Sequence, residues 1–142
     1  MDKNKRTEIA SLGEFKLIDR ICAPFQSEQS STVKGAGDDA AVIDTGDKYL
    51  LLSNDLLLEG VHFDLTYFPL QHLGYKAVVV GISDILAMNG TPRQILIALG
   101  LSSRFSVEMV DLFYEGVRAA CKDYHVDLAG GDTTASINGL TI

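Results

Sequence analysis

The stretch Gly35-Ala-Gly-Asp-Asp-Ala-Ala-Val-Ile43 places two adjacent carboxylates, Asp38 and Asp39, in a glycine-rich turn that opens an apolar run. Like charges crowded on a tight turn repel each other, so such a pair is stable mainly beside a cation. Hard divalent cations prefer oxygen ligands, and magnesium usually takes one or two carboxylates, water and a substrate phosphate. The turn therefore indicates either a magnesium-dependent nucleotide site or a solvated acidic turn.

A β-hairpin is predicted directly after this turn. Apolar runs at 40–44 and 49–54 flank the glycine-bearing segment Thr45-Gly46-Asp47-Lys48. The second run closes with Ser53-Asn54-Asp55, and alternation along a strand would place Ser53 and Asp55 on one face. This triplet is either a second group of metal ligands or a set of polar residues that simply ends the strand.

The rest of the chain predicts an α+β fold. Residues 56–70 have no clean period and predict an irregular crossing segment. Apolar spacing predicts further helices and strands, and the polar segment 26–34 predicts a loop. The predicted helices are 13–23, 73–88 and 106–125, and the predicted strands are 94–101, 126–129 and 138–142. Hairpins mixed with single crossover helices favour a mostly antiparallel sheet with helices on one face.

Composition excludes several functional classes. The 142 residues carry a formal charge of −7, with 12 basic and 19 acidic residues, which argues against a nucleic-acid surface. No apolar run approaches the ~18 residues of a membrane span, and the charged N-terminus lacks a signal sequence's apolar stretch. We expect residues 1–12 to be mobile, and Cys22 and Cys121 to be buried free thiols of a cytoplasmic protein.

Asp84 is the candidate metal ligand with the most informative sequence context, because it falls in the apolar helix predicted over 73–88. It shares a row with Val80 and Met88 at i±4. A buried carboxylate must be paired, protonated or bound to metal. Asp84 is therefore either a salt-bridge or capping residue, or a metal ligand.

Two other positions are weaker by themselves. Gly130-Gly131-Asp132 follows a predicted strand and is interpreted as a glycine–aspartate turn, where the backbone can approach a phosphate and the carboxylate can hold its cation. His62 lies in the irregular segment after the acidic cluster and is either packed, exposed or functional. His72 and His125 are interpreted as structural.

Other phosphate and metal motifs fail on spacing. The segment 35–40 superficially matches a dinucleotide fingerprint, but a strand follows it where a helix is needed. The chain has no Gly-Lys-Ser/Thr loop, zinc quartet, EF-hand or nucleophile elbow. The chemistry that remains is phosphate handling through hard cations.

Several motifs, taken in order, resemble thiamine-monophosphate kinase. They are Phe15-Lys-Leu-Ile, Gly37-Asp-Asp-Ala-Ala, Ser53-Asn-Asp, Glu59-Gly-Val-His-Phe, Tyr75-Lys-Ala, Ser83-Asp-Ile-Leu-Ala-Met and Leu128-Ala-Gly-Gly-Asp-Thr-Thr. The resemblance covers residues 13–142, which correspond to the N-terminal domain of that family, and implies that a C-terminal domain is absent from this chain. The family lies within the aminoimidazole ribonucleotide synthetase-like superfamily.

The resemblance implies phosphorylation of thiamine monophosphate to thiamine diphosphate, with ATP as co-substrate and two or more magnesium ions. No catalytic side chain is assigned, because the acceptor phosphate oxygen is already anionic. The four ligand aspartates, with no lysine or arginine expected nearby, would hold the magnesium ions. His62 would approach the substrate, and Asp38 would lie behind the ligands or shape the turn. The implied magnesium ligands are Asp39, Ser53, Asn54, Asp55, Asp84 and Asp132, and the implied nucleotide contacts are Gly131, Asp132 and Tyr114.

The family pattern further implies a four-stranded sheet whose uncovered face pairs with that of a second subunit to form a barrel, hence a homodimer. Asn54 departs from the threonine common at its position, although its amide oxygen can still ligate. Two alternatives remain. One is another ATP-using enzyme of the superfamily, and the other is a dimerising or metal-binding module that catalyses nothing by itself.

Overall fold

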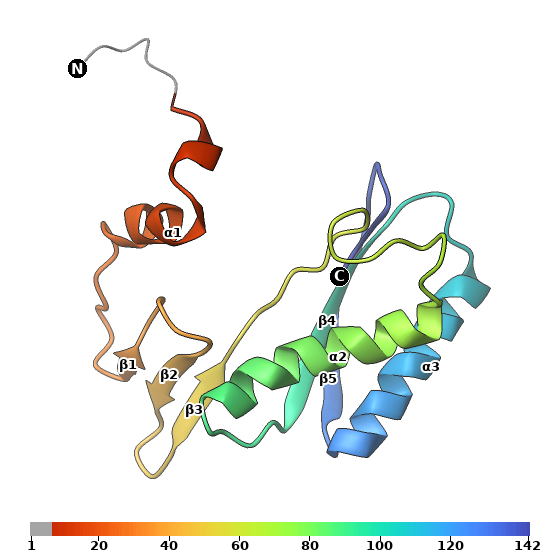
Figure 1. Ribbon diagram of the computed structural model, residues 1–142. Coiled ribbons are helices and arrows are strands. Elements are labelled where there is room, and N and C mark those ends of the chain that lie inside the picture. Colours follow the sequence, from red (N-terminus) through yellow and green to blue (C-terminus); the bar gives the residue numbers. More distant parts are fainter. Residues whose placement is uncertain (1–6) are drawn as a thin grey trace. The chain divides into compact units, whose positions relative to one another are not determined.

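The computed structural model describes residues 7–142 and divides into two compact units, Met1–Leu52 and Ser53–Ile142 (Figure 1). Each unit contains one three-stranded sheet. The α+β class is confirmed, but two small sheets take the place of the single sheet expected from the sequence. Of the N-terminal segment predicted to be mobile, residues 1–6 lie outside the described residues, and Ile9–Ser11 form a 3-10 turn.

The first unit is built around the predicted hairpin. It contains α1 (Glu14–Cys22), β1 (Thr32–Lys34), β2 (Ala41–Asp44) and β3 (Tyr49–Leu52), with the strands antiparallel in the order β1-β2-β3. At the turn, the Thr45 amide donates to the Lys48 carbonyl at 2.9 Å, and Gly46 adopts a φ of 99°. The helix before Pro24 and the hairpin are therefore confirmed.

Two sequence-based boundaries in this unit are wrong. The predicted loop 26–34 ends in strand β1, which pairs with β2 through a register irregularity between Thr32 and Lys34. Three residues are too short to show a period, so only the pairing partner reveals this strand. The strand predicted over 49–54 ends at Leu52, so Ser53-Asn54-Asp55 follows it as irregular chain.

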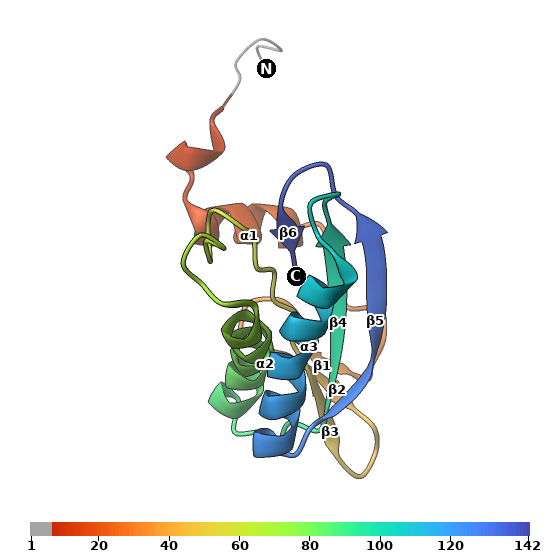
Figure 2. The ribbon, with the colours of Figure 1, turned by 90° about the vertical axis from the view of Figure 1, so that its right-hand side faces the viewer.

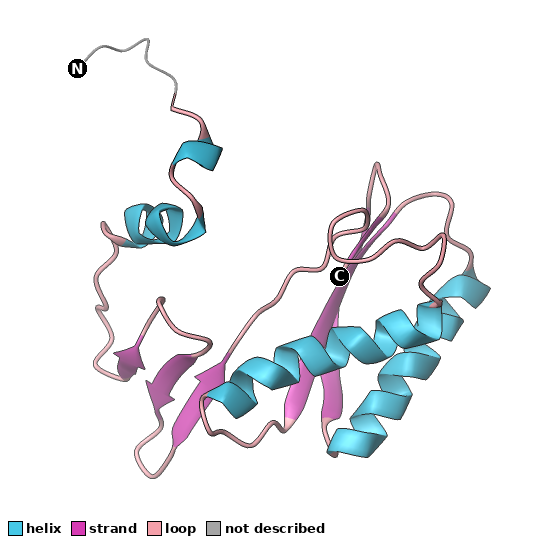
Figure 3. Ribbon diagram, viewed as in Figure 1, coloured by secondary structure: helices cyan, strands magenta, loops and turns pink. Residues whose placement is uncertain are grey.

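The second unit is a helix pair on a mixed sheet. It contains α2 (Leu70–Ala87), β4 (Gln94–Leu101), α3 (Val107–Tyr124), β5 (Asp127–Ala135) and β6 (Leu140–Thr141). The strand order is β5-β4-β6, with β4–β5 parallel and β4–β6 antiparallel. The crossover through α3 explains the parallel pair. Residues 53–69 contain no helix or strand, as predicted for most of this segment (Figure 3).

Both long helices cover one face of this sheet (Figure 2). Alternation along β4 turns Ile97 and Leu99 into the core, while Leu96 remains 74% exposed on the opposite face. Their core partners on the helices are Leu73, Val78, Ile82, Phe113, Val117 and Ala120. The prediction of helices on one face therefore holds for this unit.

Local signals set the helix ends. The Ser106 hydroxyl accepts from the Met109 amide at 3.4 Å and caps α3, as the sequence predicts. After α2, Asn89 adopts a left-handed φ of 56°, and the Gly90 amide donates to the Ile85 carbonyl at 2.8 Å. The predicted stop is confirmed, with Asn89 as the left-handed residue before Gly90.

Two further expectations concern the burial of the cysteines and whether any helix could cross a membrane. Cys22 and Cys121 are free, and each is half-buried rather than fully buried. None of the helices within residues 7–142 has the length and apolar character that crossing a membrane requires.

Candidate nucleotide and metal site

A hollow of about 480 Å³ beside edge strand β5 brings together the three residues predicted to contact nucleotide. Tyr114 of α3 lines it together with Gly131 and Asp132 of β5. Burial raises the pKa of the half-buried Tyr114 hydroxyl, so this group remains a neutral hydrogen-bond donor at physiological pH. The remaining lining residues are Ile97, Leu128, Ala129, Gly130 and Thr133.

Backbone forms much of this wall. The interpretation of Gly130-Gly131-Asp132 as a turn is wrong, because all three residues lie within β5. Ala129 is the extra residue of a β-bulge, since Leu128 pairs with Ile95 whereas Gly130 pairs with Leu96. The sequence signal resembled a turn because glycine also serves bulges and close backbone contacts.

Gly131 is required by close approach of β4 to β5. A Cβ atom at this position would lie 1.8 Å from the carbonyl oxygen of Ile97, and the glycine has a φ of 155°. The neighbouring Asp132 is exposed, as are all residues of β5. The bulge and the glycine thus present bare backbone and one carboxylate at a sheet edge, an arrangement that suits a phosphorylated ligand and its cation.

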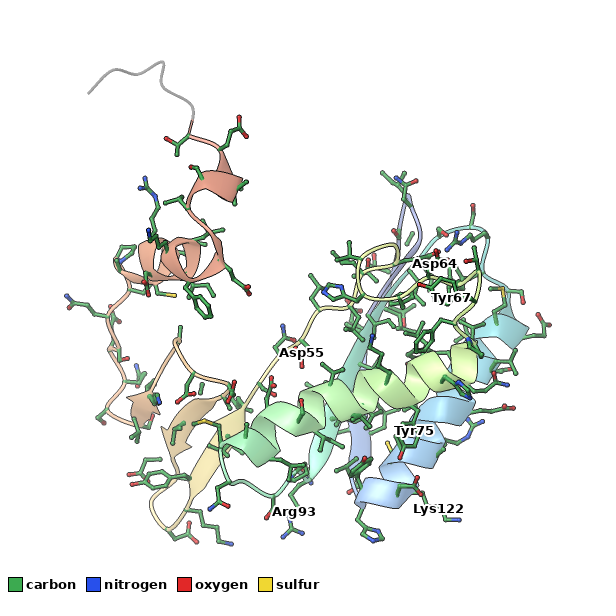
Figure 4. All side chains as sticks on the ribbon, in the orientation of Figure 1. Asp55, Asp64, Tyr67, Tyr75, Arg93 and Lys122 are labelled. Carbon is green, nitrogen blue, oxygen red and sulfur yellow. The ribbon has the colours of Figure 1, made fainter. Side chains whose placement is uncertain are left out.

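The first residue of the Ser53-Asn54-Asp55 segment contacts α2. The Ser53 hydroxyl donates to the Gly81 carbonyl at 3.3 Å. Gly81 precedes the half-buried Asp84 by three residues, so both occupy one side of the helix. Asp55 is exposed on the loop that continues from Ser53 (Figure 4).

The predicted carboxylate ligands do not form a complete metal site within residues 7–142. Among residues 7–142, no group of three or more Asp, Glu, His or Cys side chains could hold a metal ion. Asp55 and Asp132 of the second unit are exposed, and so is Asp39 of the first. Their oxygen donors suit magnesium chemically, but the joint coordination by four aspartates stays a prediction.

Asp38 shapes the glycine-rich turn of the first unit. Its carboxylate forms an ion pair with Lys34 and accepts a hydrogen bond of 3.0 Å from the Asp39 amide. The bond from Lys34, followed by that from the Asp39 backbone, holds the pKa of Asp38 below its usual value. This ion pair involves Asp38 and none of the four aspartates predicted as magnesium ligands, so the expectation that no lysine lies near those four stays a prediction.

Hydrogen bonds hold His62 within the irregular segment that contains it. Its Nδ1 accepts from the Leu58 amide at 2.9 Å, and its carbonyl accepts from the Lys76 ammonium at 2.7 Å. The neighbouring Phe63 is buried in the core, whereas the His62 ring is exposed.

Sequence reasoning missed the residues that hold this loop. Glu59 accepts from the Leu140 amide at 2.8 Å and forms an ion pair with Arg104. Lys76 and Glu59 lie in segments that the motifs singled out, but Arg104 had no local signal because its partner is distant in the chain.

Comparison with known proteins finds a family match over most of the chain. Residues 37–142 match the family described as "AIR synthase related protein, N-terminal domain". A thiamine-monophosphate kinase of Aquifex aeolicus is 41% identical over 128 residues, which cover 90% of this chain and 40% of the relative. The enzyme of that name from Bacillus subtilis is 38% identical over 132 residues, covering 92% of this chain and 40% of the relative.

A solved structure described as "AaThiL complexed with AMPPCP and TMP" has a TM-score of 0.83 and 37% identity to this chain. The match covers 96% of this chain and 41% of that one. The chain thus spans about 40% of the length of the curated relatives it matches.

Proposed function

The chain belongs to the AIR synthase related protein family, in its N-terminal domain, and we propose that it is the ATP- and magnesium-binding part of a thiamine-monophosphate kinase. The observation that carries the proposal is the hollow beside β5, where Tyr114, Gly131 and Asp132 lie together. Relatives named for this activity match nearly the whole chain, and the similar solved structure is described as holding an ATP analogue.

In the proposed reaction, an oxygen of the thiamine monophosphate phosphate attacks the γ-phosphorus of ATP. A new P–O bond forms, the bond from the γ-phosphorus to the bridging oxygen breaks, and ADP leaves with thiamine diphosphate as product. Because the attacking oxygen is already anionic, no side chain needs to remove a proton. The chain's task is to bind and align the two phosphorylated substrates.

Each part of the site has a proposed role. The edge backbone at Gly131 contacts the nucleotide phosphates, Tyr114 contacts the nucleotide, and His62 contacts the substrate. When bound, magnesium would neutralise charge between the ATP phosphates and the acceptor phosphate. Its proposed ligands are Asp39, Ser53, Asn54, Asp55, Asp84 and Asp132.

Chain assembly and location form part of the same proposal. Leu96 projects from the face of β4 opposite the helices and is 74% exposed. The family resemblance implies that this sheet face pairs with a second copy in a barrel, so we propose a cytoplasmic homodimer with Leu96 at its interface. Sedimentation of the wild-type chain and of Leu96→Lys tests this: a dimer that the substitution does not weaken would contradict the proposed face.

Thermal melting tests the activity proposal. Magnesium with a non-hydrolysable ATP analogue should raise the Tm, and thiamine monophosphate should raise it further. Aminoimidazole ribonucleotide precursors serve as the control ligand. An effect of the nucleotide without any effect of thiamine monophosphate would favour another ATP-using enzyme of the family, and no effect of nucleotide would contradict the proposal.

A further inference from the structure

Three of the four polar atoms of His62 are occupied within the second unit. The backbone amide donates to the Leu58 carbonyl at 2.9 Å, and Nδ1 accepts from the Leu58 amide at 2.9 Å. The carbonyl accepts from the Lys76 ammonium at 2.7 Å. Within the part of the chain that the structure describes, only Nε2 makes no hydrogen bond, and the residue is exposed.

These contacts determine which ring nitrogen carries the proton. A backbone amide can only donate, so Nδ1 of His62 must present its lone pair to Leu58. In a neutral imidazole the proton then resides on Nε2. Rotating the imidazole by about 180° around the Cβ–Cγ bond would place its Cδ2 hydrogen against the Leu58 amide hydrogen, and the hydrogen bond would be lost. The loop therefore leaves Nε2 as the outward N–H donor.

Lys76 connects this loop to a rigid element. It lies on α2, and its ammonium is 5.6 Å from the centroid of the Phe68 ring while it donates to the His62 carbonyl. On the other side, the Glu59 amide and carboxylate both bond to Leu140, at 3.0 and 2.8 Å. The peptide segment that carries His62 is thus anchored on α2 and at β6.

We propose that Lys76 is a positioning residue, which holds His62 so that its Nε2–H donates to a phosphate-monoester oxygen of the acceptor substrate. The ammonium beside the His62 carbonyl adds positive charge next to this donor, which favours an anionic acceptor. His62 then binds substrate without removing a proton. The identity of the ligand rests on the proposed kinase function, whereas the tautomer and the role of Lys76 rest on geometry alone.

Nitrogen NMR of the histidine-labelled chain tests the positioning step without any ligand. At neutral pH we expect His62 to show an unprotonated, hydrogen-bonded Nδ1 and a protonated Nε2. Lys76→Met keeps most of the aliphatic stem but removes the donor, so the two ring nitrogens should shift toward averaged values. A protonated Nδ1 in the wild-type chain, or an unchanged spectrum in Lys76→Met, would overturn the proposal.

Two substitutions of His62 separate the loop bond from the substrate bond. His62→Asn keeps an acceptor near the Nδ1 position and lacks the outer donor. It should retain the wild-type Tm but bind thiamine monophosphate about tenfold more weakly, the loss expected for one hydrogen bond. His62→Gln places an amide N–H near the Nε2 position but lacks the inner acceptor. It should lower the Tm and retain the affinity for thiamine monophosphate. Equal affinity in both variants would contradict a donor role.

The same chain distinguishes failure of the two proposals. Inorganic phosphate, titrated in parallel, shows whether the ester oxygen alone shifts the Nε2 signal. If the tautomer and the Lys76→Met effect are found but neither ligand moves the signal, the positioning role stands and the kinase assignment fails for this loop. If ligands bind while the tautomer is wrong, the kinase assignment stands and this inference fails.

Discussion

Gly74 of α2 and Gly116 of α3 lie where the two helices press backbone against backbone. A Cβ atom on Gly74 would lie 1.9 Å from the Phe113 carbonyl oxygen, and one on Gly116 would lie 1.8 Å from the Gln71 carbonyl oxygen. No side chain fits between the helices at this crossing. The contact fixes the distance between α2, which carries Asp84 and Lys76, and α3, which carries Tyr114.

Gly74→Ala should therefore destabilise the second unit by about 2–3 kcal/mol, because the new methyl group must push the helices apart. The matched control is Gly81→Ala, in the same helix, where the added Cβ would meet no atom within 4 Å beyond the adjoining residues and backbone of α2 itself. The control should be neutral or stabilising by up to about 1 kcal/mol, since glycine costs entropy within a helix. Denaturant unfolding followed by circular dichroism measures both, and equal losses would contradict close helix packing.

His125→Gly should stabilise α3. His125 ends this helix in the left-handed conformation, with φ 55° and ψ 44°, which costs about 1 kcal/mol for a residue with a side chain but not for glycine. His72→Gly is the matched control, because His72 lies inside α2 and glycine there should cost about 1 kcal/mol. Opposite shifts in Tm are expected; a loss of stability in both variants would show that the His125 side chain makes a compensating contact.

Tyr75→Phe should change the dependence of stability on high pH. The Tyr75 hydroxyl donates to the Asp123 carboxylate at 3.1 Å, between α2 and α3 (Figure 4). The neighbouring Tyr124 hydroxyl, burial and the Asp123 carboxylate raise the pKa of Tyr75 to about 12. An unfolded chain loses this proton near pH 10 (roughly, for a free tyrosine). The folded state thus keeps a proton that the unfolded state has released.

It follows that the contribution of Tyr75 is complete below roughly pH 10 and is lost as the pH rises towards 12. Urea unfolding of the wild type at intervals across this range should show falling stability, and the fall should be smaller in Tyr75→Phe. Tyr67→Phe, with its ring exposed, is the control. Parallel curves for wild type and Tyr75→Phe would show that the hydroxyl keeps an ordinary pKa.

Asp84→Asn should weaken the magnesium-dependent binding of an ATP analogue. An amide is nearly the same size as the carboxylate but brings no charge to the cation, so we expect at least about a tenfold loss of affinity. Binding is read as the ligand-induced shift in Tm relative to each unliganded variant, which removes any direct effect on folding. Asp47→Asn, in the exposed hairpin turn, is the control. Unchanged magnesium dependence in Asp84→Asn would remove this residue from the ligand set.

Much of the candidate site follows from local patterns, while its assembly does not. The period of residues 94–101 and the Ser106 cap predict β4 and the start of α3, because each depends on neighbouring residues alone. The motif at Gly130-Gly131-Asp132 is predicted as a turn, and these three residues line the hollow beside β5. Its true form, a bulge followed by strand, depends on how β5 pairs with β4. Likewise, the partnership of Glu59 with Arg104 has no local signature.

Local sequence patterns were enough to predict the α+β class, most helix and strand positions, and the oxygen-rich residues that suit phosphate and magnesium. These depend on periodicity, capping and side-chain chemistry, which short segments carry. Long-range packing, by contrast, sets the parallel pairing of β4 with β5, the position of Tyr114 beside Gly131 at the hollow, and the contact of Lys76 with His62. Such relationships join residues distant in the chain, and burial of the shared helix–sheet core selects them from many pairings that local preferences alone would allow.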